Sequence, residues 1–210
     1  MGRASRERAT LEIGQRIITG ELAAGARLDE DALARELAED PMIVRDALCF
    51  LRRDGFVRDA DDGGFAVTEL DEVELREAYP IAILLEGLAV RTAPAHPPEL
   101  LAELRAHNAA MEREGCDAAA AATHDFRFHD ALAAACGNEQ LLATLRPLKR
   151  MLLRYELAYL RDRGVVDDSV RRHGEIVDAL ERGDRERAAA CVEANFRDAM
   201  PALLERIAPA

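Results

Sequence analysis

The chain has no tryptophan, few aromatic residues and no apolar run long enough to cross a membrane. Aromatic residues make up 4% of its 210 residues, whereas β-sandwiches and barrels use them heavily in their strands. The N-terminal segment MGRASRERATLEIG lacks the apolar stretch of a signal peptide, and no segment approaches the roughly 18 to 20 apolar residues of a membrane-spanning helix. We therefore expect a cytoplasmic protein that has no membrane partner and is not all-β.

Cysteine is scarce, and the motifs of common enzyme classes are missing. The four cysteines contain no CxxC pair, so we expect small buried side chains without a metal or redox role; they are Cys49, Cys116, Cys136 and Cys191. The chain also lacks GxSxG, GxxxxGK[ST] and GxGxxG, which typify hydrolases, phosphate-binding loops and dinucleotide-binding domains. We therefore do not expect an enzyme.

Acidic residues outnumber basic residues by 40 to 28, which gives a net charge of −12. This balance favours solubility and opposes indiscriminate binding to nucleic acid or anionic membrane, so any DNA contact must be local. Hydrophobic residues still make up 49% of the chain, enough to bury a core and to exclude global disorder. The length suits one large domain or two small ones.

The first third of the chain alternates helical and strand patterns. Apolar residues recur at helical spacing over 6–20 and 31–37, and Asp40-Pro41 predicts the start of a third helix that ends at Gly55. The β-prone runs FVR and FAVT follow, separated by DADDGG, whose residues favour a hairpin turn. Three helices and a β-hairpin predict a winged helix-turn-helix DNA-binding domain over residues 1–68.

Beyond residue 68 the strand pattern disappears, so the fold class is mainly α. Helical periodicity, interrupted at proline, glycine and asparagine, divides the remainder into six helices. Their predicted ranges are 71–94, 98–114, 117–136, 139–163, 166–182 and 185–207, with Gly164 marking one of the breaks. We expect residues 69–210 to form an all-α antiparallel helical bundle.

Three residues of this bundle have the chemistry of metal ligands. Asp125 and His129 are four residues apart on a predicted helix, so their side chains share a face and can reach one ion. His173 lies on a later helix and meets that face if the bundle is antiparallel. A carboxylate and two imidazoles suit Zn, Ni, Mn or Fe. From the residues alone, the plainer interpretation is favoured, in which Asp125 and His129 form a surface pair and His173 is hydrogen-bonded elsewhere.

The order of these parts resembles a GntR-family transcriptional regulator of the FadR subfamily, in which a winged helix precedes an all-helical, FCD-type domain for effector binding and dimerisation. The resemblance runs nearly end to end. It rests on IITGELAAGARLDEDALARELA, VRDALCFLRRDGFV and GGFAV in the N-terminal part, and on LREAYPIAILLEGLAVRTA, DFRFHDALAAACGNEQLL and HGEIVDALERGDRERAA in the C-terminal part. It implies a homodimer that binds a double-stranded DNA operator and responds to a small organic acid.

The resemblance also implies a metal site in the bundle. Many relatives hold a divalent metal with one Asp and three His, and Asp125, His129 and His173 match three of these positions. The fourth position falls on Asn195, whose amide is a weaker ligand than imidazole, with water as an alternative. Ala82 stands where many relatives carry an arginine that meets the ligand. We expect a metal such as Zn, Ni or Mn, held more loosely than in four-ligand relatives.

In the N-terminal domain the resemblance assigns a DNA contact to Arg45 on the recognition helix and a wing position to Gly64. Met42 lies on the outward face of the same helix, so we expect it at the DNA as well. The recognition helix departs from the family pattern, because Pro41 replaces an arginine and Asp40 brings a negative charge toward phosphate. Residues 1–68 carry 10 basic and 14 acidic residues, a net charge of −4. A net negative charge is unfavourable for a DNA-binding domain, because DNA phosphates are also negatively charged.

Together these observations predict a ligand-responsive, DNA-binding transcriptional regulator. Two alternatives stay open. The first is a regulator-like, metabolite-binding dimer that no longer binds DNA specifically, and the second is a metal-dependent enzyme built on the bundle.

Overall fold

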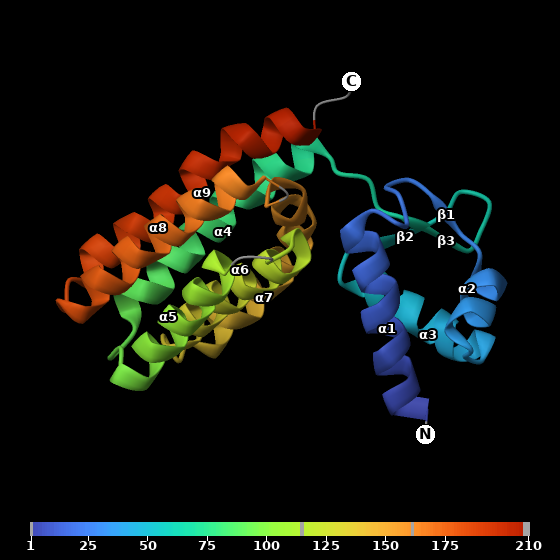
Figure 1. Ribbon diagram of the computed structural model, residues 1–210, viewed down its shortest axis with the longest axis horizontal. Coiled ribbons are helices and arrows are strands. Elements are labelled where there is room, and N and C mark those ends of the chain that lie inside the picture. Colours follow the sequence, from blue (N-terminus) through green and yellow to red (C-terminus); the bar gives the residue numbers. More distant parts are fainter. Residues whose placement is uncertain (1, 114–115, 161, 208–210) are drawn as a thin grey trace. The chain divides into compact units, whose positions relative to one another are not determined.

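The computed structural model describes residues 2–113, 116–160 and 162–207 (Figure 1). Within these ranges the protein is helical apart from one small sheet near the N-terminus. Contacts divide the chain into two compact units, Met1–Leu70 and Asp71–Ala210. Each unit has its own buried core.

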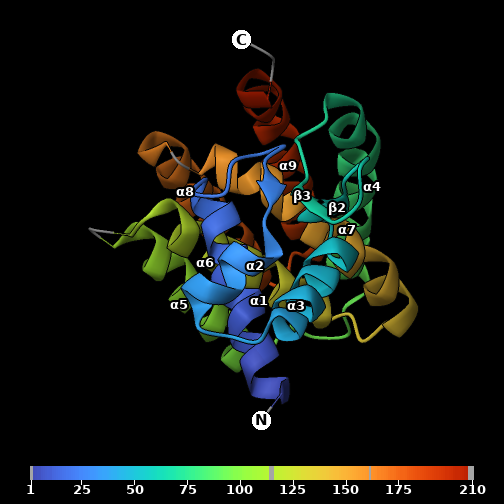
Figure 2. The same cartoon turned by 90° about the vertical axis from the view of Figure 1, so that its right-hand side faces the viewer.

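The N-terminal unit is a winged helix (Figure 2). Its elements are α1 (Gly2–Thr19), β1 (Arg27–Leu28), α2 (Glu30–Leu37), α3 (Pro41–Arg53), β2 (Val57–Asp59) and β3 (Phe65–Val67). Helix α3 packs against α1, α2 and β2. Ile13, Val44 and Leu48 are fully buried at the centre of these contacts.

The sheet contains one strand more than the sequence predicted. Strands β2 and β3 form the expected hairpin, with Val57 opposite Val67. Strand β1 pairs antiparallel with the other edge of β3, so the order is β1-β3-β2. Two residues are too few to show strand alternation, and the pairing joins segments far apart in sequence, so the pattern could not reveal β1.

Aspartates begin the two short helices. Asp29 caps α2 by accepting hydrogen bonds from the backbone N–H groups of Asp31 and Ala32, both at 3.0 Å. Asp40 caps α3 by accepting from Met42 N at 2.8 Å, and Pro41 occupies the first helical position, where no N–H is needed. The same residues that predicted the start of α3 therefore produce it.

The C-terminal unit is a bundle of helices. Its elements are α4 (Glu72–Thr92), α5 (Pro98–Glu112), α6 (Ala118–Ala134), α7 (Glu139–Tyr159), α8 (Arg163–Glu181) and α9 (Arg185–Ile207). Helix α4 packs against α7 and α9, α8 packs against α5 and α9, and α6 packs against α5 and α7. No described helix combines the length and apolar character that crossing a membrane requires.

One predicted break in the bundle is wrong. Gly164 was expected to separate two helices, but it lies in the first turn of α8, and α7 ends earlier, at Tyr159. Asp162 caps α8 by accepting a hydrogen bond from Gly164 N at 2.9 Å. A glycine costs little in a first turn once a side chain caps it, so the cap decides where the helix begins.

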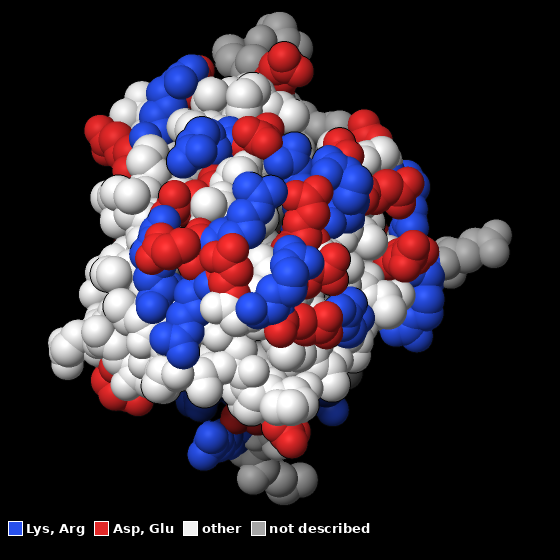
Figure 3. All heavy atoms as spheres, turned by 90° about the vertical axis from the view of Figure 1, so that its left-hand side faces the viewer, with Lys and Arg blue, Asp and Glu red and all other residues white. Residues whose placement is uncertain are grey.

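The bundle carries charged and polar residues both on its surface and in its interior. Figure 3 shows arginine side chains interspersed with Asp and Glu on the face that it presents. The centre also holds polar groups, and the buried set comprises Glu86, Asp125, His129, Lys149, Arg154, Ser169, His173 and Asn195. Because burying such groups without partners is costly, their contacts indicate where the bundle has a specific site.

Candidate functional site

Helix α6 carries two of the predicted ligands on its buried face. Asp117 caps the helix by accepting from Ala120 N at 2.7 Å. Asp125 and His129 follow one turn apart, so both side chains point inward, and only 7% and 1% of their surfaces are exposed. The interpretation as a surface pair is therefore wrong.

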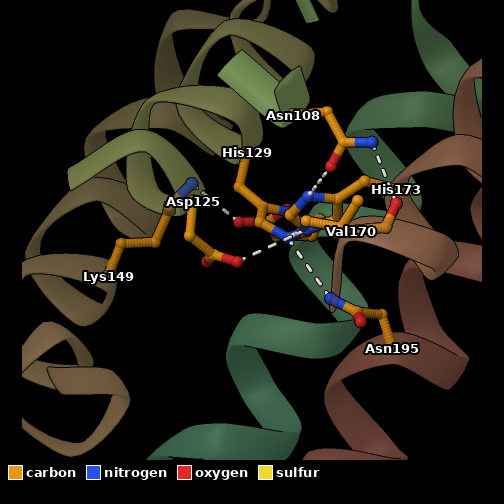
Figure 4. Close-up of polar contacts among 8 residues, drawn as sticks. Asn108, Asp125, His129, Lys149, Val170, His173 and Asn195 are labelled. Carbon is orange, nitrogen blue, oxygen red and sulfur yellow. Dashed lines mark hydrogen bonds and ion pairs between the residues drawn. The ribbon is translucent and has the colours of Figure 1, made fainter. Parts of the chain in front are cut away.

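Figure 4 shows that the four predicted ligands converge, although they come from three helices. His173 Nε2, from α8, lies 3.2 Å from His129 Nε2 and 3.4 Å from Asp125 Oδ1. The ligand atoms of these three residues all lie within 4.8 Å of one another. Asn195 Nδ2, from α9, lies 3.4 Å from His129 Nε2.

The far side of each imidazole faces a hydrogen-bond acceptor. Asn108 donates from Nδ2 to the Val170 carbonyl oxygen at 2.9 Å, which leaves its Oδ1 to accept from His173 Nδ1 at 3.2 Å. Glu86 Oε2 accepts from His129 Nδ1 at 3.0 Å. With each Nδ1 atom donating to its acceptor, the two Nε2 atoms face each other at 3.2 Å, where they can share a proton or a cation.

Glu86 is itself held by the only lysine of the chain. Lys149 Nζ lies 2.9 Å from Glu86 Oε1, at ion-pair distance although outside hydrogen-bonding angles, and both side chains are buried. Burial acts to raise the pKa of Glu86, but Lys149 and His129 together outweigh it and lower this pKa below its ordinary value. The carboxylate therefore stays ionised and keeps His129 oriented.

Burial also shifts the pKa values of two of the ligands. Burial, with His129 alongside, lowers the pKa of His173 well below its ordinary value, so its imidazole is neutral and can offer Nε2 to a metal. Burial raises the pKa of Asp125, and the opposing charges of His129 and Lys149 only partly offset it. The cluster is thus a place where a further positive charge is favourable.

This donor set fits a divalent cation. One carboxylate oxygen and two imidazole nitrogens suit Zn, Ni and Mn, and acceptors behind both imidazoles are the outer hydrogen bonds typical of metal-bound histidine. Asn195 offers an amide at the fourth position. Ala82 is buried in α4 and has no charge to offer a ligand.

A small cavity adjoins the cluster and shares Asp125 and Asn195 with it. Its volume is about 20 Å³, enough for about one water-sized group, and it lies among α4, α6, α7, α8 and α9. The lining residues are Tyr79, Asp125, Glu156, Tyr159, Leu160, Ser169, Asn195, Phe196 and Ala199. Burial, with Asp125 nearby, raises the pKa of Glu156 to about 8.

The three predicted DNA-contact residues also come together. Met42, Arg45 and Gly64 line one groove of the N-terminal unit, about 620 Å³ in volume, together with Arg27 and Pro41. Met42 is 66% exposed at the start of α3. Gly64 has a φ of +75°, and a Cβ there would lie 3.2 Å from Arg27 Nη2, so a side chain at this wing position would press on that guanidinium.

The arginines of this groove pair with acids of the same unit. Arg45 Nη1 lies 3.2 and 3.1 Å from the two carboxylate oxygens of Glu30, and Arg27 pairs with Asp62 of the wing. Exposed ion pairs of this kind contribute little free energy and exchange readily with solvent ions. They therefore reduce the attraction to phosphate without preventing it.

Sequence reasoning missed four residues around the buried cluster: Glu86, Asn108, Lys149 and Glu156. Two of them have recognisable sequence features, because Glu86 is the only charge in the apolar run IAILLEGLAV and Lys149 is the only lysine. Asn108 on α5 and Glu156 on α7 have no such feature in their surrounding sequence. Their roles follow only from which helices pack together.

Comparison with known families matches both units. Residues 5–67 match the gntR family of bacterial regulatory proteins, and residues 77–198 match the FCD domain. A probable D-xylose utilization operon transcriptional repressor of Paenarthrobacter nicotinovorans is 33% identical over 185 residues, which cover 87% of this chain and 80% of that protein. The matching families and this relative are regulators, not enzymes.

Two solved structures share the fold over almost their whole length. E. coli McbR/YncC superposes with a TM-score of 0.81 at 21% identity, covering 96% of this chain and 97% of that one. A putative GntR transcriptional regulator from Rhodococcus sp. RHA1 gives a TM-score of 0.81 at 22% identity, covering 96% and 98%. At these identities the likeness establishes the fold alone.

Proposed function

Because the chain belongs to the GntR family of bacterial regulatory proteins and carries an FCD domain, we propose that its winged helix binds a double-stranded DNA operator and that its bundle binds a small organic acid. The chain is thus a transcriptional regulator, and the ligand and the metal are the proposal. The observation that carries this proposal is the convergence of Asp125, His129 and His173 inside the bundle.

In this proposal Asp125 Oδ1 and the Nε2 atoms of His129 and His173 hold a divalent metal, with Asn195 or water at a fourth position. The metal supplies a positive centre to which the carboxylate of an acid can bind. Glu86 and Asn108 keep the two Nε2 atoms turned toward this centre.

The acid enters through the cavity that adjoins the cluster. Because the cavity admits about one water-sized group, a larger ligand must displace part of its wall, either side chains or a surrounding helix. Ligand binding would then shift the bundle toward a different conformation. The relative from P. nicotinovorans is named for D-xylose utilization, so D-xylose and its sugar acid belong among the compounds to test.

DNA binding is proposed for the groove lined by Met42, Arg45 and Gly64. Helix α3 presents Arg45 at the surface, where a phosphate can replace Glu30 as its partner. The same groove also exposes acids, which favours weak phosphate contacts over strong ones.

A homodimer is proposed from an apolar stripe on α4. Ile81, Leu84 and Leu88 are spaced three and four residues apart, so they share one face, and they are 49%, 66% and 44% exposed. Exposed apolar stripes mark interaction surfaces, and paired winged helices read the two half-sites of an operator. Light scattering that finds a monomer at micromolar concentration contradicts this part of the proposal.

A regulator-like dimer without specific DNA binding is the second candidate. It is favoured by Asp40 at the start of α3 and by the pairing of Arg45 with Glu30. In both candidates the bundle binds the same ligand, so only DNA binding separates them.

The test is a fluorescence-anisotropy titration of labelled DNA from upstream of the protein's own gene, with unrelated DNA as the control. We expect tighter binding to the upstream DNA and a change of affinity when zinc and an effective acid are added. Equal affinity for both DNAs at every salt concentration favours the second candidate. If no acid alters the melting temperature of the zinc-loaded protein, the proposal that the bundle binds a small organic acid is contradicted.

A further inference from the structure

The cavity beside the metal cluster has the wrong charge for a ligand that is only an acid. Two of its lining side chains are carboxyl groups, Asp125 and Glu156, and none of its described lining residues is Lys, Arg or His. Tyr79, Tyr159 and Phe196 are the aromatic residues among the rest of the lining. Carboxylates and aromatic rings are the groups that receive organic cations.

Glu156 is the most informative residue of this wall, because its carboxyl group has no partner among the described side chains. It is half-buried on α7, and no described side chain donates a hydrogen bond to its carboxyl group or forms an ion pair with it. Two cations of the same helix are engaged elsewhere: Lys149 with Glu86, and Arg154 with Glu74. A carboxyl group that lines a cavity without a partner costs free energy unless a ligand supplies the donor.

We propose that the ligand presents a cationic amine to Glu156 and is therefore a small amino acid. Its ammonium group pairs with the Glu156 carboxylate, and the aromatic rings of the wall contact its sides. The cavity, at about 20 Å³, fits one ammonium group, which is close to a water molecule in size. The carboxylate of the ligand extends past Asp125 toward the metal. This carboxylate contact, unlike the ammonium contact, rests on the proposed function.

The charge balance of the site supports an amine over a second acidic group. When a divalent cation compensates Asp125, the ionised form of Glu156 has no positive partner in the cavity lining. One ammonium group neutralises it, whereas a dicarboxylate would place a like charge beside it.

The experiment uses the full chain, stripped of metal with EDTA, in mildly alkaline buffer. The probes are n-propylammonium and propionate, which differ in their charged end group, and binding is followed by saturation-transfer NMR of the probe. We expect propylammonium to bind and propionate not to bind. Glu156→Gln should weaken amine binding about tenfold or more, because it removes a charge-assisted hydrogen bond. Glu139→Gln, an exposed carboxylate on the same helix, is the matched control and should change nothing.

Three results overturn the inference: propionate binding as tightly as propylammonium, amine binding unchanged in Glu156→Gln, or no amine binding to the wild-type chain. The comparison of the two probes uses the wild-type chain, so it decides the matter even if the variant does not fold. A separate titration of zinc-loaded protein with acids tests the proposed function. If amines bind in EDTA but no acid binds with zinc, the metal-and-acid proposal fails and the amine site survives.

Discussion

The candidate sites of the two units hold their charged groups in opposite ways. In the N-terminal unit, Arg45 is exposed and pairs with Glu30 at the edge of a groove. In the bundle, Glu86 is buried between Lys149 and His129. Exposed pairs contribute about 0–1 kcal/mol, whereas breaking a buried pair costs roughly 3–5 kcal/mol. DNA can therefore compete for the first kind of pair, while the second is fixed before any ligand arrives.

The largest expected effect comes from breaking the buried pair. Lys149→Met leaves the Glu86 carboxylate buried without its cation, so we expect the free energy of unfolding to fall by about 3–5 kcal/mol near neutral pH. Arg45→Met breaks an exposed pair and should cost less than about 1 kcal/mol. Urea unfolding of both variants measures the contrast. Equal losses would show that burial does not distinguish the two units.

A new imidazole at the fourth ligand position should strengthen the metal site. Asn195 Nδ2 lies 3.4 Å from His129 Nε2, so Asn195→His places a stronger donor beside the cluster. We expect zinc affinity to rise about tenfold or more. Competition with a coloured chelator measures the dissociation constant. An unchanged affinity would mean that position 195 does not face the metal.

Two substitutions in the groove should change DNA affinity in opposite directions. Arg45→Ala removes a charge-assisted contact and should weaken DNA binding by about 1–3 kcal/mol. Glu30→Gln removes the charge that competes with phosphate for Arg45 and should strengthen it, as should Met42→Arg. Anisotropy titrations at fixed salt measure all three variants. If none differs from wild type, α3 does not contact DNA.

The pH dependence of stability should reveal Glu156. Its pKa is raised from an ordinary value of 4.5 to about 8 in the folded chain, so between these values the folded state binds its proton more tightly than the unfolded state does. The contribution of this group to stability is therefore complete below pH 4.5 and declines as pH rises toward 8. Glu156→Gln should thus gain stability relative to wild type across this window in EDTA. Melting curves measured over the range check this, and a constant difference contradicts it.

The smallest expected effect concerns the cap of α3. Asp40→Ser keeps a side-chain oxygen for Met42 N and removes the negative charge, so melting should hardly change while nonspecific DNA binding tightens. Asp40→Ala loses the cap as well and should cost about 1 kcal/mol. If the serine variant loses as much stability as the alanine variant, the hydrogen bond to Met42 N is not what stabilises the helix start.

Local sequence patterns predicted most of the fold because they act over a few residues. Asp40-Pro41 marked the start of α3, and the four-residue spacing of Asp125 and His129 placed both on one helix face. The wrong prediction at Gly164 also depends on a neighbour only a few residues away, because Asp162, two residues earlier, decides where α8 begins. Where a glycine and a capping side chain compete within one turn, composition alone does not decide the boundary.

The partners of the buried cluster could not be predicted because they are far apart in sequence. Glu86 and His129 are 43 residues apart, and His173 and Asn108 are 65 apart. The expected antiparallel bundle supplied His173 and the resemblance to a family supplied Asn195, but neither supplied the residues that orient them. The partner of Arg45 was equally hidden, since Glu30 belongs to a different helix.

The most direct test of this account is a calorimetric titration of zinc into the EDTA-stripped chain. The account predicts saturable binding of a single zinc ion per chain, abolished in His129→Ala and retained in the control His96→Ala, because His96 lies outside the cluster. Absence of zinc binding to the wild-type chain, or binding that persists unchanged in His129→Ala, would contradict it.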